Sequence, residues 1–308
     1  MEPRYPTPVF TPESATANID LYSLVATLGL GHGGETLVNP KPRLLPENPA
    51  EILDKPTKIV GVSPAPIEGY IDGIQASRVL SWQNQRPIVL QYAAAGLLTP
   101  EMVLKHGVEQ LGLFCAEEDK HLVAGVVPDD MVVTTNATEP DDVTRNAVAN
   151  IHKWRETLEL TIAQKAIGTN SSDGLVVCDG SLIGHKPHRN LVGLIKTVNT
   201  RYLADETGLW SLPFSWRSSI FKMPPNRGHL DVTWSCYLRL TDAQNHRWDY
   251  GLVRLESFNP DLLEPLAAQV LNSRQNVGNT DPRGDRHIGP IAAVETHLKA
   301  RRSPIFDL

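Results

Sequence analysis

Cysteine is scarce in this chain, whose 308 residues include only Cys115, Cys178 and Cys236. An odd, widely spaced set without a Cys-x-x-Cys pair excludes a disulfide framework and a zinc knuckle, and we expect a reducing, cytoplasmic setting. The chain also lacks an apolar run of the roughly 18–20 residues that a membrane-spanning helix needs. Its N-terminus carries proline and acid in place of the basic patch and apolar stretch of a signal peptide. We therefore expect a soluble, unexported protein with no membrane partner.

An excess of basic residues is missing as well. The chain has 29 Lys and Arg against 35 Asp and Glu, which gives a formal net charge of −6 with His neutral. This balance argues against a generally basic nucleic-acid coat of the histone type. It leaves open an enzyme with a local basic channel, because net charge says little about any one site. At roughly 150 residues per domain, the length predicts about two domains or one large one.

Proline concentrates in the first part of the chain. Residues 1–66 predict one helix, at about 15–28, and an extended proline-rich arm that wraps the body of the protein or a partner. The character of the sequence changes after this arm. We expect residues 67–308 to form a separate unit that carries the chemistry.

Two strands and a long helix dominate the first half of this unit. The segments 69–80 and 86–95 read as strands joined by a short polar link, which predicts an antiparallel hairpin. Residues 141–167 form the best predicted helix, because apolar residues recur along it at spacings of three and four. The run 174–181 then reads as a buried central strand that ends in an acid.

The second half of the unit predicts further parts of a mixed sheet. Residues 229–240 alternate between apolar and polar, and 247–257 are the expected hairpin partner of this strand. Two helices are expected, at 259–273 and 290–302, the first with proline at its first helical position. The order of elements predicts an α/β fold with a mixed sheet flanked by helices.

Four acidic residues stand where catalytic carboxylates usually stand. They lie on two strands, a helix and a hairpin: Asp72, Asp179, Glu159 and Glu256. An Asp inside an apolar strand costs several kcal/mol unless a partner compensates it. Two Asp-Gly steps at strand positions therefore favour acids that converge on Mg²⁺ or Mn²⁺, which prefer oxygen ligands. Asp-Gly is also a common turn signature, and Arg254 shares a strand face with Glu256, so an internal ion pair there is equally open.

Five short motifs occur in a fixed order along the chain. They are Tyr-Ile-Asp72-Gly, Arg155-Glu-Thr-Leu-Glu159-Leu, Val-Val-Cys-Asp179-Gly-Ser-Leu, Val192-Gly-Leu-Ile-Lys196-Thr and Val253-Arg-Leu-Glu256. In this order and approximate spacing, they resemble the NurA nuclease family over about residues 66–300. The resemblance implies an RNase H-like core, related to the PIWI-type nucleases, and Mn²⁺- or Mg²⁺-dependent exo- and endonuclease activity on DNA. It also implies a homodimer that docks on HerA, a hexameric ATP-driven DNA translocase, in DNA end resection or in defence against phage.

Carried onto this chain, the resemblance assigns the metal carboxylates to Asp72, Glu159 and Asp179. It places Lys196 against the scissile phosphate or the DNA strand. Glu156, one helical turn from Glu159, is the rival for the helix position. The implied mechanism is metal-assisted phosphodiester hydrolysis, in which one ion activates a water and a second stabilises the leaving oxygen.

The C-terminal motif departs from the family, whose pattern has a Tyr there and a His eight residues later. In this chain the two positions hold His287 and Glu295, and His297 lies too far round the helix to substitute directly. Either Glu295 acts as a further metal ligand or the enzyme is weakened. The second alternative, together with the acidic net charge, supports a rival hypothesis: a catalytically silent adaptor or regulatory subunit of the motor.

The segment between residues 196 and 230 interleaves basic and aromatic residues. The basic ones, which are candidates to line a DNA path, are Arg201, Arg217, Lys222 and Arg227. The aromatic ones, which suit stacking on a single strand, are Trp210, Phe214, Trp216 and Phe221. The same segment is equally consistent with a core plus a lid.

Overall fold

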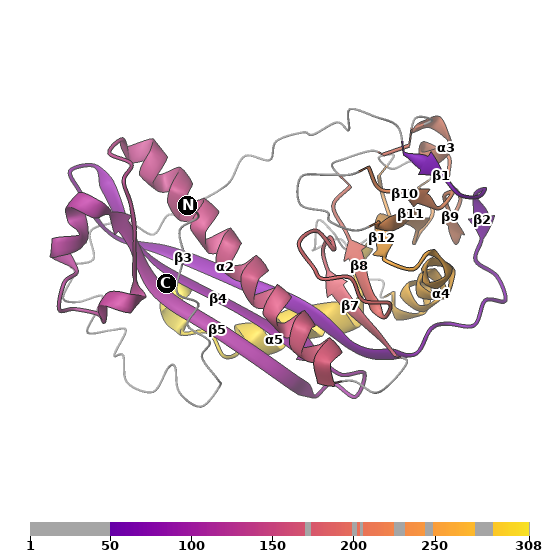
Figure 1. Cartoon of the computed structure of the whole chain (residues 1–308), viewed down its shortest axis with the longest axis horizontal. Coiled ribbons are helices and arrows are strands. Elements are labelled where there is room, and N and C mark those ends of the chain that lie inside the picture. Colours follow the sequence, from indigo (N-terminus) through magenta and orange to yellow (C-terminus); the bar gives the residue numbers. More distant parts are fainter. Residues whose placement is uncertain are drawn as a thin grey trace.

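The computed structural model describes residues 50–169, 174–198, 202–203, 206–224, 232–243, 249–274 and 286–307. Within these residues the chain is a mixed α/β protein built on one twelve-stranded sheet, with helices packed on both faces (Figure 1). The predicted α/β class with a mixed, helix-flanked sheet is confirmed. The predicted helix at 15–28 and the arm up to residue 49 lie outside the described residues. No helix that the structure describes is long and apolar enough to cross a membrane.

Three long antiparallel strands form one half of the sheet. They are joined in a meander: β3 (Ile67–Gln83), β4 (Arg86–Leu98) and β5 (Leu104–Ala116). Asn84 and Gln85 both have positive φ, 49° and 68°, as a two-residue hairpin turn requires, so the predicted hairpin is confirmed. β5 is not among the strands predicted from the sequence. Most residues in the first half of β5 are only partly buried, so apolar and polar residues do not alternate clearly there and the sequence gives no strand signal.

Two short strands continue the sheet on the other side of β3. β7 (Leu175–Asp179) runs parallel to β3, and β8 (Leu191–Ile195) runs parallel to β7. The buried strand predicted at 174–181 is therefore confirmed. The order across the centre of the sheet is β5-β4-β3-β7-β8. Because β7 and β8 are parallel, the residues at their carboxyl ends lie at the same end of the sheet.

An antiparallel hairpin extends the sheet beyond β8. β12 (Leu252–Ser257) pairs with β8 on one side and with β11 (Trp234–Arg239) on the other, which confirms the predicted hairpin. Apolar and polar residues alternate along β11, but the polar residues do not face solvent. Ser235, Tyr237 and Arg239 are as buried as the apolar residues between them, because residues from the 206–224 segment pack over that face.

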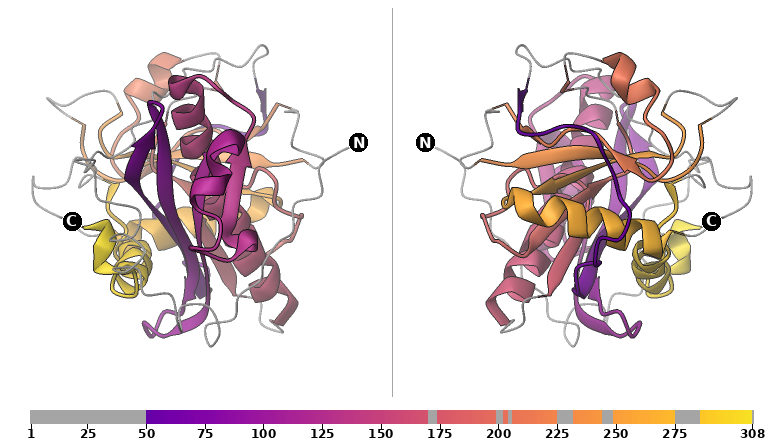
Figure 2. Two further views of the ribbon diagram at one scale, coloured as in Figure 1. Left: turned by 90° about the vertical axis from the view of Figure 1, so that its left-hand side faces the viewer. Right: turned by 90° about the vertical axis from the view of Figure 1, so that its right-hand side faces the viewer.

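Helices cover both faces of the sheet (Figure 2). α2 (Pro140–Thr169) packs on one face through buried apolar residues, which confirms the helix predicted at 141–167. α4 (Leu263–Ser273) and α5 (Gly289–Lys299) pack on the opposite face and confirm the two later helices. The other helical segments of the described residues are α3 (Glu206–Trp210) and short 3₁₀ turns at Glu117–Leu122, Asp129–Met131, Pro260–Leu262 and Pro304–Phe306.

Short strands complete the sheet at its edges. They are β1 (Glu51–Ile52), β2 (Thr57–Lys58), β6 (Val132–Thr135), β9 (Trp216–Arg217) and β10 (Phe221–Lys222). β1 pairs with β10 and β2 with β9, so the described end of the proline-rich arm adds to the sheet on the β11 side. The buried Arg217 contacts Asp54 and Glu264 from Nη2, at 2.6 and 3.2 Å. These ion pairs tie the end of the arm to α4.

Candidate active site

Asp72 and Asp179 lie side by side on neighbouring parallel strands. In the register of β3 with β7, Ile71 stands opposite Cys178, so the next residue on each strand is an acid. Side chains alternate along a strand, and Asp72 shares a face with Tyr70, which packs in the core under α4 and α5. Asp72 is only 6% exposed, so its carboxylate is one of the few buried charges of the sheet.

Lys196 brings a positive charge to this pair of acids. It follows β8 directly, and its Nζ donates to Asp179 Oδ2 at 3.0 Å. Both side chains are mostly buried, at 15% and 21% exposure, so water screens their attraction only in part. The same ammonium acts on Asp72, whose Oδ1 accepts a hydrogen bond from the Gly73 backbone N–H at 2.7 Å.

Glu159 approaches the same acids from α2, on the opposite face of the sheet. Its carboxylate lies over Gly73: a Cβ at that glycine would stand 2.4 Å from Glu159 Oε1, closer than Cβ atoms come in folded proteins. Arg155, one turn earlier, donates from Nη1 to Glu159 Oε1 at 3.1 Å. Glu156 faces solvent. The geometry therefore favours Glu159 over its rival.

Burial and like charges make the ionised form of these acids costly. Burial raises the pKa of Asp72 well above its ordinary range, the charge of Asp179 raises it further, and Lys196 opposes the rise. Burial also raises the pKa of Glu159 to about 7, against the opposing charge of Arg155 and with a further rise from Asp179. Negative charges held together in this way favour a bound cation.

The donor atoms suit a hard divalent cation. Asp72, Glu159 and Asp179 offer oxygen atoms only, which Mg²⁺ and Mn²⁺ prefer, and a cation would relieve the repulsion among them. In the described part of the chain, no three His, Cys, Asp or Glu side chains already form a group that could hold a metal ion.

The candidates near the C-terminus have contacts of their own on and beside α5, the helix that packs against β3. Glu295 is partly exposed on α5 and forms an ion pair with Lys299, one turn along the same helix, at 2.8 Å. His297 is exposed, with its Nδ1 2.8 Å from Ala293 O. His287 has a buried Nδ1 with no hydrogen-bond partner among the residues that the structure describes. We call four of the predicted residues, which act on one another through a contact or through their charges, the acid cluster: Asp72, Glu159, Asp179 and Lys196.

Two neighbours of the acid cluster have roles in the structure that the sequence-based hypothesis does not assign to them. Gly73 leaves room for the Glu159 carboxylate, and Arg155 orients that carboxylate. A signal for Arg155 exists, because Arg and Glu four residues apart on a helix form ion pairs. Nothing local identifies Gly73 in this role, since what lies above a strand glycine depends on how the helix packs.

Glu256 is engaged by internal partners. It is fully buried, and Arg254 Nη2 donates to its Oε1 at 2.7 Å. Its Oε2 accepts hydrogen bonds from Ser181 Oγ at 2.9 Å and from the Leu182 backbone N–H at 2.8 Å. Of the two alternatives that the sequence leaves open for Arg254 and Glu256, the structure has the internal ion pair.

The basic and aromatic segment divides between core and surface. Arg217 is buried by its ion pairs, and Phe221 is fully buried, so neither lines a surface path. Trp210 and Phe214 are 45% and 49% exposed and are available for stacking. Lys222 is partly exposed, with its Nζ 3.7 Å from an acid of β1. Two of the basic candidates lie outside the described residues: Arg201 and Arg227.

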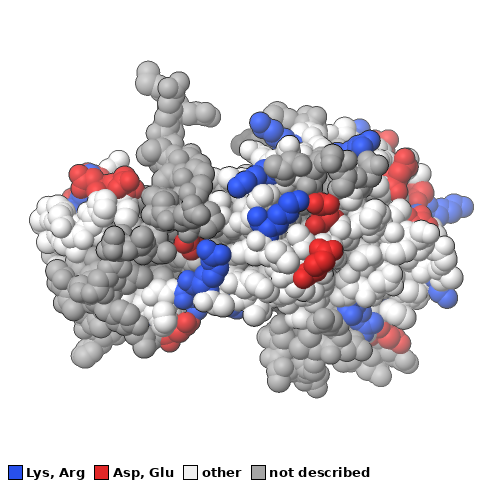
Figure 3. Space-filling model, turned by 90° about the horizontal axis from the view of Figure 1, so that it is seen from below, with Lys and Arg blue, Asp and Glu red and all other residues white. Residues whose placement is uncertain are grey.

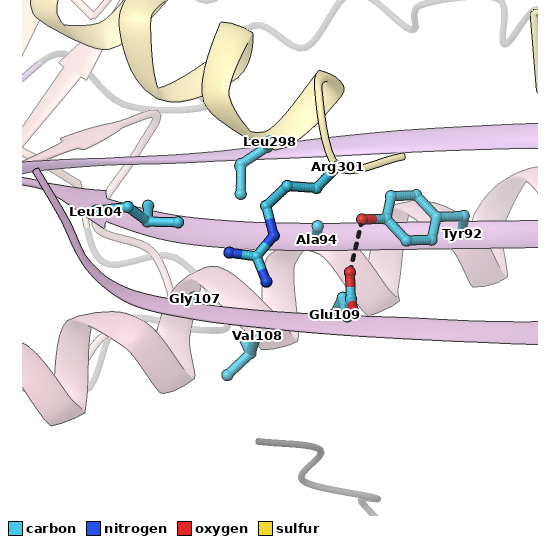
Figure 4. A pocket seen from close by; sticks show the side chains of 8 residues that line it. All are labelled: Tyr92, Ala94, Leu104, Gly107, Val108, Glu109, Leu298 and Arg301. Atoms are coloured by element: carbon cyan, nitrogen blue, oxygen red, sulfur yellow. Dashed lines mark hydrogen bonds between the residues drawn. The ribbon is translucent and has the colours of Figure 1, made fainter. Parts of the chain in front are cut away.

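A separate hollow opens beside the C-terminal end of α5 (Figure 4). Apolar side chains of β4, β5 and α5 line it, and Arg301 reaches over them. Its acid, Glu109, accepts a hydrogen bond from the Tyr92 hydroxyl at 3.0 Å. One acid that is already paired gives a weaker case for catalysis than the acid cluster does.

The surface seen from below mixes charges of both signs. Lys and Arg side chains lie next to Asp and Glu across this face (Figure 3). The described residues visible there form no continuous basic patch, so an expected DNA path is not marked by charge on this side.

No family model matches the chain, and no curated protein matches it. The resemblance of the ordered motifs therefore has no support from these comparisons. The acid cluster is the feature of the described residues that points most directly to a function.

Proposed function

We propose that the chain is a metal-dependent deoxyribonuclease that hydrolyses phosphodiester bonds with Mn²⁺ or Mg²⁺. The acid cluster carries this proposal: two aspartates stand on adjacent parallel strands, a helix glutamate lies over a strand glycine, and a lysine contacts one aspartate. Acids whose ionised forms are destabilised by burial and by each other are concentrated at functional sites. A divalent cation is the partner that best offsets this repulsion.

Each member of the acid cluster has a part in this reaction. Asp72 and Asp179 would hold the metal ion, with Glu159 as the third carboxylate. The bound ion would supply polarisation of the phosphate and activation of a water. Without a bound ion the Glu159 carboxyl has a pKa of about 7, so it can release its proton near neutral pH when a cation binds. Lys196 Nζ, which now contacts Asp179 Oδ2, can donate instead to a phosphate oxygen of the scissile bond.

The strand order supports the RNase H-like core that we propose for the fold. β3, β4 and β5 form an antiparallel meander, α2 follows in the chain, and β7 and β8 then add in parallel beyond β3. The acid cluster lies where β7 ends while β3 continues. The carboxyl ends of parallel strands are a common place for ligand sites in α/β sheets.

We extend the proposal to the partners that the motifs imply. The chain would act as a homodimer on DNA, together with a HerA-type hexameric DNA translocase, in end resection or anti-phage defence. The ordered set of motifs supports this part of the proposal. Four residues of these motifs form the acid cluster.

The test is cleavage of labelled single- and double-stranded DNA with Mn²⁺ or Mg²⁺, in the presence and absence of the motor ATPase. The wild-type protein should cut, and Asp72→Ala and Asp179→Ala should each abolish cutting. Glu156→Gln changes an exposed acid one turn from Glu159 and is the matched control, which should cut like the wild type. Cutting that survives in both aspartate variants would refute the proposed site.

A catalytically silent adaptor of the same motor is the second candidate function. Two observations favour it: the ion pair of Lys196 with Asp179 already neutralises one acid, and the Glu295 carboxylate already pairs with Lys299. An adaptor should cut no DNA even with the motor present. Its thermal unfolding midpoint should also be unchanged by Mn²⁺, whereas a metal-binding nuclease should be stabilised.

A further inference from the structure

The chain turns sharply directly after Asp179. Gly180 has a φ of 135°, which residues with a side chain rarely adopt, and its N–H donates to Leu194 O at 2.9 Å. The turn lies directly on β8, because a Cβ at Gly193 would stand 2.7 Å from Gly180 O. The orientation of Asp179 is thus coupled to the way this turn sits on β8.

Glu256 holds this turn from two strands away. It stands opposite Gly193 in the register of β12 with β8, and because Gly193 has no side chain the carboxylate and the turn come together. Glu256 Oε2 accepts hydrogen bonds from Ser181 Oγ at 2.9 Å and from Leu182 N–H at 2.8 Å. Both residues of the turn that follow Gly180 are therefore fixed to one buried carboxylate.

Lys196, the partner of Asp179, is held in a similar way. Arg286 Nη1 donates to Lys196 O at 2.7 Å, and Arg286 Nη2 lies 3.1 Å from Asp249 Oδ2. Both members of the ion pair consequently have their backbones tied to neighbouring elements.

Burying the ion pair of Arg254 and Glu256 costs desolvation free energy, and a gain in stability does not account for its presence. The two residues are 5% and 0% exposed, and the Arg254 guanidinium lies 4.8 Å from the centroid of the Tyr202 ring. A buried ion pair is often no more stabilising than apolar side chains of the same volume. Apolar side chains at these positions would not accept the two hydrogen bonds from the turn.

We propose that Glu256 is a positioning residue, which fixes the turn at Ser181 and Leu182 and so holds the Asp179 carboxylate against Lys196. It acts through the turn and contacts no reacting group. The catalytic consequence of this inference rests on the proposed function. The coupling between the turn and the ion pair does not rest on it, because all of its contacts lie within the chain.

A double-mutant cycle in metal-free protein tests the coupling. Ser181→Ala removes the hydrogen bond from Ser181 Oγ to Glu256 and the one that Ser181 Oγ accepts from Ile183 N–H at 3.3 Å, and it leaves Arg254 paired with Glu256, so the fold should be retained. Lys196→Met removes the ion pair. If Glu256 positions Asp179 through the turn, the double variant should lose less in thermal midpoint than the two single losses added together.

Ser235→Ala is the matched control for this cycle. Ser235 lies opposite Glu256 on the adjacent strand, and its buried hydroxyl donates to Leu255 O at 2.7 Å. The control loses a buried hydrogen bond in the same part of the sheet without touching the turn. Its midpoint loss should be additive with that of Lys196→Met.

The second readout is the cleavage of single-stranded DNA with Mn²⁺. Ser181→Ala should lower kcat about ten-fold with little change in KM for DNA, as loss of a partner that orients a metal ligand does. Ser235→Ala should leave kcat unchanged. Additive midpoints in the cycle of Ser181 with Lys196, or an unchanged kcat for Ser181→Ala in an active enzyme, would overturn the inference. A non-additive cycle in a protein that cuts no DNA would support the role of Glu256 and refute only the proposed function.

Discussion

Replacing Glu159 by Gln should remove a pH dependence from the stability of the metal-free protein. The Glu159 side chain is 14% exposed, and burial raises its pKa from the ordinary 4.5 to about 7. The unfolded chain releases this proton near the ordinary value, whereas the folded protein keeps it until about pH 7. Wild-type stability therefore gains from this proton at low pH and loses that gain as the pH rises from 4.5 to about 7.

The size of the effect follows from the two pKa values. One pKa unit corresponds to about 1.36 kcal/mol, so a rise from 4.5 to about 7 corresponds to about 3 kcal/mol. Gln keeps the shape of the side chain and can still accept a hydrogen bond from Arg155, but it does not titrate. The free energy of unfolding of the variant should match that of the wild type near pH 4.5 and exceed it by up to about 3 kcal/mol above pH 7.

Urea unfolding at a series of pH values, with a chelator present, measures this difference. Subtracting the wild-type curve from the variant curve cancels the other titrating groups, which both proteins share. Glu156→Gln changes an exposed acid on the same helix, and its difference from the wild type should not vary over this pH range. A constant difference for Glu159→Gln would refute the reasoning, because the carboxylate would then not be buried beside Asp179.

Three further predictions test the geometry. Gly73→Ala should lower the Mn²⁺-dependent cleavage rate about 100-fold, because its methyl displaces the helix glutamate above it by about 1 Å. Gly107→Ala, whose nearest neighbouring atom is 3.5 Å away, should cut like the wild type, and equal rates for the two variants would contradict the geometry. Arg86→Met should lower the urea-measured free energy of unfolding by about 3–5 kcal/mol, since Asp119 loses a buried two-bond partner; a loss under about 1 kcal/mol would contradict this. Phe221→Ala should cost about 3–5 kcal/mol as a core residue, whereas a stable variant with weakened DNA binding would restore the stacking hypothesis.

Local signals are enough for some elements of the fold. The hairpin of β3 and β4, the helix α2 and the strand β7 each have a strong period or a clear turn, and all three form where the sequence predicts them. β5 and the two-residue strands β1, β2, β9 and β10 have no such signal. They exist because a distant segment offers an edge to pair with, which depends on pairings between residues far apart in the chain.

The acid cluster also combines residues that the sequence identifies with an arrangement that it does not. Asp72 and Asp179 are identifiable from the sequence because an acid followed by glycine in an apolar strand is unusual. The sequence does not decide between Glu156 and Glu159 as the helix acid, because both lie on one helix within a turn of each other.

The sequence by itself determined the hairpin of β3 and β4, the helix α2 and the strand β7, because period, caps and turn residues act over a few neighbours along the chain. It also determined the chemical types that the chain can bring to a site. Only the tertiary structure decided which acids meet. The register of β3 with β7 aligns Asp72 with Asp179, and the packing of α2 places Glu159 over Gly73. Both arrangements depend on long-range contacts, which no local pattern of residues specifies.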